Sequence, residues 1–155
     1  MSFNNRGSLG YYSALFRTRP PPDLASLAGS HRASFVGPGW LRATSGPTIA
    51  LGGLGGWWGK SFDLQGNGTN VVRRHGALVQ TLPMRATPAA SLVDGRQGIT
   101  ISYAPGSPVP WPWVVDEARR LDETTLLCLT IIKAPGLRRL WFPFILRRQE
   151  LTDER

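Results

Sequence analysis

Three carboxylates and one histidine are placed where they could transfer protons. Asp63, Asp116 and Glu117 each lie in an expected strand among apolar neighbours, where loss of hydration raises a carboxyl pKa toward the range that general acid–base catalysis needs. His75 ends another expected strand, and its imidazole could act as a general base. A structural interpretation competes with this one, because the carboxylates can pair with nearby arginines such as Arg119 and His75 can occupy an exposed hairpin.

Aromatic side chains suggest a second kind of chemistry, the binding of an apolar molecule. The chain has six tryptophans, and Trp57, Trp58, Trp111 and Trp113 stand beside glycine or proline at expected strand starts. Large rings at such places either plug one end of a barrel or line a mouth that receives a ligand. The candidate ligand contacts, with two arginines to receive a carboxylate or another oxygen, are Trp57, Met84, Tyr103, Trp113, Phe142, Arg73 and Arg119.

Other chemistries lack the residues that they need. Gly59, Lys60 and Ser61 resemble the end of a phosphate-binding loop, but residue 54, where its first glycine belongs, is leucine, and no helix can follow. The single Cys128 lies in an apolar strand, which argues against a thiol nucleophile and excludes cysteine clusters. The sequence therefore predicts no metal and no cofactor, with haem or nitric oxide binding through His31 or His75 as a third alternative.

The elements that must position these residues are short strands. Beyond residue 56, segments of five to ten residues alternate with turns rich in Gly, Asn and Asp, the pattern of an antiparallel sandwich or barrel. The predicted strands are 30–36, 57–64, 69–75, 77–85, 91–93, 98–103, 113–121, 124–133 and 140–148. Successive strands are expected to pair as neighbours.

The distribution of polar residues favours a closed barrel. Segment 113–121 carries ionic and apolar residues on both faces, whereas 124–133 and 140–146 are apolar on both. A barrel partly lined by polar groups, with other elements packed outside, accounts for both patterns. The prediction is an all-β protein, a single antiparallel barrel of about 8–10 strands that could hold one small ligand.

Two segments lie outside this strand pattern. Residues 1–22 form an N-terminal arm, because three consecutive prolines at its end favour an extended conformation, and its apolar stretch 11–16 can dock on the body. Residues 40–56 are predicted to form a short, broken helix across one end of the fold. Residues 23–155 are assigned to the barrel domain.

Charge and composition limit which partners the protein is expected to have. The formal net charge is +8, and the basic residues come mostly as scattered arginine pairs. This distribution does not predict a nucleic-acid partner, although it permits weak attraction to anionic surfaces. No apolar run approaches the roughly 20 residues of a membrane span, and a secretory signal pattern is missing, so a cytoplasmic location is expected. The oligomeric state stays open.

Two motifs in order resemble a known family. Residues 55–60, Gly-Gly-Trp-Trp-Gly-Lys, resemble the Gly-x-Trp-x-Gly signature of the bacterial GXWXG family. Residues 119–127, followed by 142–146, are similar to the domain of unknown function that accompanies it, and the likeness covers about residues 27–149. The resemblance implies a small lipocalin-like barrel in which Trp57 closes the bottom, and it implies no particular reaction or ligand.

These observations favour non-covalent binding of a hydrophobic or amphipathic small molecule, such as a lipid, terpenoid or polyketide-like metabolite. The alternative is a cofactor-free isomerase, cyclase or hydrolase that uses the same cavity, with Asp63, Asp116, Glu117 and His75 moving protons.

Overall fold

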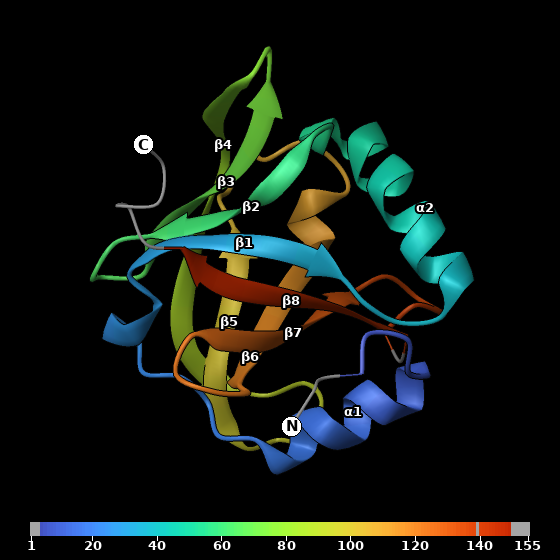
Figure 1. Ribbon diagram of the computed structural model, residues 1–155. Coiled ribbons are helices and arrows are strands. Elements are labelled where there is room, and N and C mark those ends of the chain that lie inside the picture. Colours follow the sequence, from blue (N-terminus) through green and yellow to red (C-terminus); the bar gives the residue numbers. More distant parts are fainter. Residues whose placement is uncertain (1–3, 139, 150–155) are drawn as a thin grey trace.

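The computed structural model describes residues 4–138 and 140–149, and its central feature is a closed antiparallel barrel (Figure 1). Each strand pairs with the next, and the last pairs with the first. The strands are β1 (Gly29–Phe35), β2 (Trp57–Phe62), β3 (Asn67–Arg74), β4 (Ala77–Ala90), β5 (Gln97–Tyr103), β6 (Val114–Arg120), β7 (Thr125–Ile132) and β8 (Trp141–Gln149). The predicted all-β antiparallel barrel is confirmed.

The barrel has eight strands rather than the nine listed from the sequence. The predicted strand 91–93 is a turn, because β4 continues to Ala90 and the chain reverses directly after it. The Ser91 hydroxyl oxygen organises this turn by accepting hydrogen bonds from the backbone N–H groups of Val93 (3.0 Å) and Asp94 (3.3 Å). The segment 91–93 is too short and too tightly turned to pair with a neighbour.

Helices lie outside the barrel and across one end. Helix α1 (Leu9–Thr18) lies along the outside, and α2 (Gly39–Ile49) leads into a π-helical segment, η2 (Ala50–Leu54), which agrees with the broken helix expected over 40–56 (Figure 1). Single 3-10 turns, η1 (Ala25–Leu27) and η3 (Trp111–Trp113), complete the helical elements. Within the described part of the chain, no helix combines the length and the apolar character that crossing a bilayer requires.

Helix α1 supplies the outer cover that the apolar strands need. Tyr12 and Phe16 are fully buried and pack with Leu127, Leu129 and Ile145 on the outer faces of β7 and β8. The sequence predicts that segment 11–16 docks on the body, but its helical conformation was not predicted. Both faces of β7 are therefore covered, as its apolar pattern indicated.

Inside the barrel, one end is packed solid. Phe62, Ile101, Cys128 and Leu146 belong to a buried core that also contains Leu27 of η1, which closes this end. The other end is hollow and faces α2. The fold thus positions a cavity between a packed floor and a helix.

A β-bulge in β2 decides which side chains reach this cavity. Trp57 pairs with Val72 but Gly59 pairs with Val71, so Trp58 is the extra residue. A bulge of one residue returns Trp57 and Lys60 to the same, interior side. Gly59 itself must be glycine, because a Cβ there would collide with the backbone carbonyl oxygen of His31 on β1.

Candidate functional site

The hollow end of the barrel is a cavity of about 570 Å³. This volume lies within the range of small-molecule sites in proteins, roughly 300–1,000 Å³. Its walls are mainly apolar and include Phe35, Trp57, Val114, Ile132 and Phe142 from five strands or their flanks. The geometry suits a guest that is largely apolar.

Helix α2 presents one face to the cavity. The lining positions are 40, 41, 44, 45, 48 and 49, the spacing of a single helical face. Trp40 is 60% exposed although it lines the cavity. The hydroxyls of Thr44, Ser45 and Thr48 donate to carbonyl oxygens one turn earlier in the helix, at 2.8, 2.6 and 2.7 Å. This face therefore combines apolar surface with hydroxyl oxygens.

Four polar side chains lie at the floor of the cavity, namely Lys60, Tyr103, Asp116 and Thr130. Together with the fully buried Asn70 they are here named the Lys60 cluster. The Lys60 Nζ donates to Asn70 Oδ1 at 3.0 Å and to Tyr103 Oη at 3.0 Å, and it lies 3.2 Å from Asp116 Oδ2. Lys60 and Asp116 are 1% and 2% exposed. A buried charge pair of this kind is stable only when its hydrogen-bonding capacity is filled.

The other members of the Lys60 cluster supply the hydrogen bonds that this buried ion pair needs. Tyr103 donates its hydroxyl proton to Asp116 Oδ2 at 3.3 Å, and Thr130 donates to Asp116 Oδ1 at 2.8 Å. Asn70 Oδ1 accepts a second hydrogen bond from Trp57 Nε1 at 3.1 Å. The Lys60 ammonium also lies 5.1 Å from the Tyr103 ring centre and 5.5 Å from the Trp57 ring centre, distances at which a cation and a ring attract.

Electrostatics fix the protonation states of this cluster. Burial disfavours the Lys60 ammonium, but Tyr103 and Asp116 outweigh it and raise the pKa of Lys60 above its ordinary value. Burial, together with the Asp116 carboxylate, raises the pKa of Tyr103 to about 12. Lys60 is therefore an ammonium and Tyr103 a neutral phenol at physiological pH. With Asp116 as the counter-charge, the cluster is neutral as a whole.

Several predicted ligand contacts lie in this cavity. Trp57, Tyr103 and Phe142 line it, as does Asp116 from the predicted acid–base set. Met84 lies in the buried core instead, with its sulfur 3.6 Å from Lys60 Nζ. Trp113 is 50% exposed and is not a lining residue; Trp111, at the start of the same turn, lines the cavity in its place.

The other predicted acid–base residues lie away from the cavity. Asp63 is exposed in a turn, where its carboxylate accepts from the backbone N–H groups of Gln65 and Asn67, both at 2.9 Å. His75 is exposed at the β3–β4 turn with φ of 53°. Glu117 points out of the barrel because it follows Asp116 in β6, and it accepts from the Ser91 hydroxyl and the Leu92 backbone N–H. Burial raises the pKa of Glu117.

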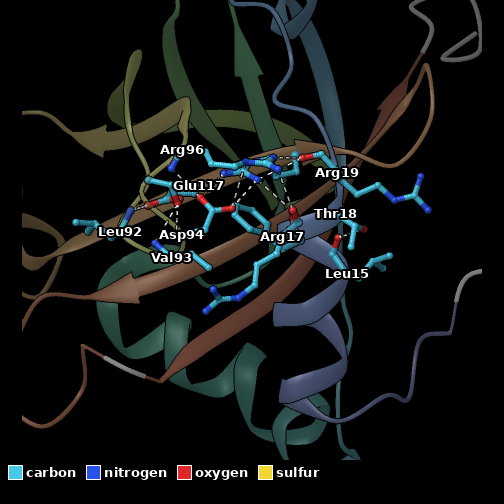
Figure 2. Close-up of polar contacts among 12 residues, drawn as sticks. Leu15, Arg17, Thr18, Arg19, Leu92, Val93, Asp94, Arg96 and Glu117 are labelled. Atoms are coloured by element: carbon cyan, nitrogen blue, oxygen red, sulfur yellow. Dashed lines mark hydrogen bonds and ion pairs between the residues drawn. The ribbon is translucent and has the colours of Figure 1, made fainter.

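The two arginines predicted to contact the ligand also lie outside the cavity. Arg73 is exposed at the end of β3. Arg119 is buried on the outer side, where its guanidinium bonds to both carboxylate oxygens of Asp94 (2.9 and 3.1 Å) and to the carbonyl oxygen of Phe16 (3.2 Å). Figure 2 shows Asp94 beside Arg96, whose guanidinium reaches the end of α1 as well. Arg119 thus secures α1 and does not face the cavity.

Sequence reasoning missed most of the Lys60 cluster and the α2 face. Lys60 was considered in the rejected phosphate-binding loop and in the Gly-x-Trp-x-Gly segment but not as a site residue, although a lysine inside an apolar strand of an arginine-rich chain is a usable signal. Thr130 gave a similar signal, a lone hydroxyl within the apolar segment 124–133. Among residues 4–138 and 140–149, no group of three or more His, Cys, Asp or Glu side chains could hold a metal ion.

Comparison with known proteins adds support for the fold. No family model matches the chain, and no curated protein matches it. A crystal structure of a protein from Thermomonospora curvata is similar, with a TM-score of 0.73, 16% sequence identity, and coverage of 94% of this chain and 90% of that chain. At this identity the likeness extends to the barrel fold alone.

Proposed function

We propose that this protein binds a hydrophobic or amphipathic small molecule non-covalently in the barrel cavity. The observation that carries the proposal is the cavity of about 570 Å³, apolar along its walls and polar only where the Lys60 cluster and the α2 hydroxyls reach it. Such a combination binds the body of a ligand by burial and orients it by a few polar groups.

Exposed aromatic surface supports this proposal. Trp40 is 60% exposed while lining the cavity, and Trp57 is half-buried there. Each 100 Å² of apolar surface that a ligand covers contributes about 2.5 kcal/mol. That gain must first offset about 4–15 kcal/mol for the freedom lost on association, so tight binding calls for a ligand that contacts both the barrel wall and α2.

A cofactor-free isomerase, cyclase or hydrolase is the second candidate function. The observation in its favour is that Asp116 and Tyr103 face the cavity together. Of the four residues first considered for acid–base chemistry, Asp116 alone lines the cavity. The ion pair with Lys60 also competes for its carboxylate. Binding without chemistry therefore has the stronger support.

A dye titration with matched variants tests the binding proposal. Nile red, a neutral dye whose emission rises in apolar surroundings, is expected to bind saturably to the wild-type protein. Ser45→Trp places a large ring in the cavity and should weaken binding at least tenfold, whereas Ala43→Trp, at an exposed α2 position outside the lining, should leave it unchanged. Equal binding by the two variants, or no saturable binding by the wild type, would overturn the proposal.

A further inference from the structure

The donors of the Lys60 cluster are fully used within the protein. An ammonium group has three protons, and Lys60 Nζ has three oxygen acceptors within 3.2 Å, on Asn70, Tyr103 and Asp116. The hydroxyl protons of Tyr103 and Thr130 both go to the Asp116 carboxylate. The side-chain amide of Asn70 donates to the carbonyl oxygen of Leu82 at 3.1 Å and to the Met84 sulfur at 3.9 Å. A ligand that needs to accept a hydrogen bond finds no uncommitted proton in this cluster.

The hydroxyl groups of α2 also have their protons committed and their oxygen lone pairs open. Thr44, Ser45 and Thr48 give their protons to helix carbonyl oxygens and present oxygen lone pairs to the cavity. Trp40 is 60% exposed, so its indole N–H does not depend on a ligand for a partner.

Acceptor capacity remains in the floor of the cavity. A carboxylate offers about four lone-pair sites. Among the residues that the structure describes, Asp116 Oδ2 receives Lys60 and Tyr103, whereas Oδ1 receives Thr130 alone. The Thr130 oxygen, having donated, keeps its own lone pairs. Both residues line the cavity, so the open capacity lies where a ligand would reach it.

A ligand that accepts a hydrogen bond from this cluster would first have to break an existing one, which costs free energy. Hydrogen bonds to an ionised group are roughly twice as strong as those between neutral groups. For a ligand carbonyl to capture the proton of Tyr103 or Thr130, the bond to the Asp116 carboxylate would have to be exchanged for a weaker one. A ligand that brings its own donor avoids this exchange.

Charge narrows the ligand class further. An anionic ligand would lie beside the Asp116 carboxylate, and a cationic ligand beside the Lys60 ammonium, with both groups almost fully buried. Because the pair is neutral as a whole, the repulsion from one member largely cancels the attraction of the other member, and the cost of removing a charged ligand from water is not offset. A neutral group avoids this cost.

We infer that the cavity selects a neutral apolar molecule that carries a hydroxyl group, an alcohol or a phenol, which donates to Asp116 Oδ1 or Thr130 Oγ1. This inference rests on the proposed binding function and names the chemical class of its ligand.

Competition against bound Nile red tests the inference with three probes of one skeleton: 2-naphthol, 2-methoxynaphthalene and 2-naphthoate. The hydroxyl probe is expected to displace the dye at a concentration at least tenfold lower than either the ether or the anion, the ratio that one charge-assisted hydrogen bond supplies. Similar potency of 2-naphthol and its ether would overturn the inference while leaving the binding proposal intact. Absence of dye binding, seen before any competitor is added, would instead reject the binding proposal.

A double variant locates the preference in the Lys60 cluster. Lys60→Met with Asp116→Leu removes both charges together, so no unpaired charge stays buried. This variant is expected to bind Nile red and to lose most of the preference for 2-naphthol. The control replaces an exposed pair of the same charges, Lys133→Met with Glu123→Leu, and should keep the preference. A preference that survives in the first double variant would exclude Asp116 as the acceptor and leave Thr130, which the additional substitution Thr130→Val removes. A preference that survives the additional substitution as well would overturn the assignment to the Lys60 cluster.

Discussion

Lys60 on β2 and Asp116 on β6 form an ion pair of 3.2 Å between opposite sides of the barrel. Three strands separate β2 from β6 in either direction around the ring. The packed core begins on one side of this pair, at Met84, and the cavity lies on the other. The pair therefore marks the boundary between the solid and the hollow halves of the interior.

Removing one member of this pair should be strongly destabilising. Lys60→Met leaves the Asp116 carboxylate buried without its counter-charge, and we expect a loss of about 3–5 kcal/mol in the free energy of unfolding. Denaturant unfolding measures this loss. The exposed Lys133→Met is the control and should change stability by less than about 0.5 kcal/mol. A loss in Lys60→Met no larger than in the control would show that the pair contributes nothing to stability.

The same cluster predicts a loss of stability at alkaline pH. Folding raises the pKa of Tyr103 from 10.0 to about 12, so above pH 10 the native state holds a proton that the unfolded chain has lost. Stability contributed by this group is complete below pH 10 and falls as the pH rises toward 12, by about 3 kcal/mol in total. The raised pKa of Lys60 acts in the same direction.

Unfolding free energies measured at several alkaline pH values test this trend. Tyr103→Phe should show a shallower decline than the wild type, because one of the contributing groups is gone. Tyr11→Phe, at an exposed position, should decline as the wild type does. Identical slopes for all three proteins would argue against a buried phenol in the cluster.

Arg119 should hold α1 against the barrel. Arg119→Met removes the two short hydrogen bonds to Asp94, which keeps the more distant guanidinium of Arg96 at 3.6 Å, and it also removes a donor from the Phe16 carbonyl oxygen. We therefore expect a loss of about 2–3 kcal/mol. Limited proteolysis should also cut more readily within the described N-terminal segment. Arg147→Met, on the exposed side of β8, is the matched control. Unchanged proteolysis in Arg119→Met would indicate that apolar packing of Tyr12 and Phe16 holds α1 by itself.

Two glycine substitutions should have opposite effects. Gly59→Ala forces a Cβ onto the His31 carbonyl oxygen and should separate β1 from β2, with a loss of more than about 3 kcal/mol or failure to fold. Gly10→Ala lies in α1, where a Cβ meets the Ser8 hydroxyl oxygen at an ordinary contact distance of 3.9 Å, and should add about 0.5 kcal/mol. Thermal unfolding of both variants compares them directly. Tolerance of alanine at position 59 would contradict the close approach of the two strands.

The barrel was predictable because its turns and its hydrophobic patterns are local. Gly and Asn between 65 and 68 mark the β2–β3 turn, and apolar residues on both faces of 124–133 indicated a strand covered on both sides. Helix α1 was not predicted, because a ten-residue helix gains its stability from burial of Tyr12 and Phe16 rather than from its own propensities.

The site was harder to predict because it depends on register. By simple alternation Trp57 and Lys60 point to opposite faces, and only the bulge at Trp58 brings them together. Asp116 and Glu117 are adjacent carboxylates of the same strand, and the sequence alone did not indicate which one faces inward. Closure of the ring decides this, because it fixes which side of β6 meets the interior.

Strand β7 is covered on both faces, and this protects its backbone hydrogen bonds from local unfolding. Its outer residues Leu127 and Leu129 lie under α1, while its inner residues Leu126 and Cys128 lie in the core, so water meets neither face of residues 126–129. Amide protons of this part of β7 should exchange with solvent deuterium only when the whole domain unfolds, whereas those near the exposed β3–β4 turn should exchange through brief fraying. The slowest-exchanging part of this molecule is thus expected on the side of the barrel that carries α1.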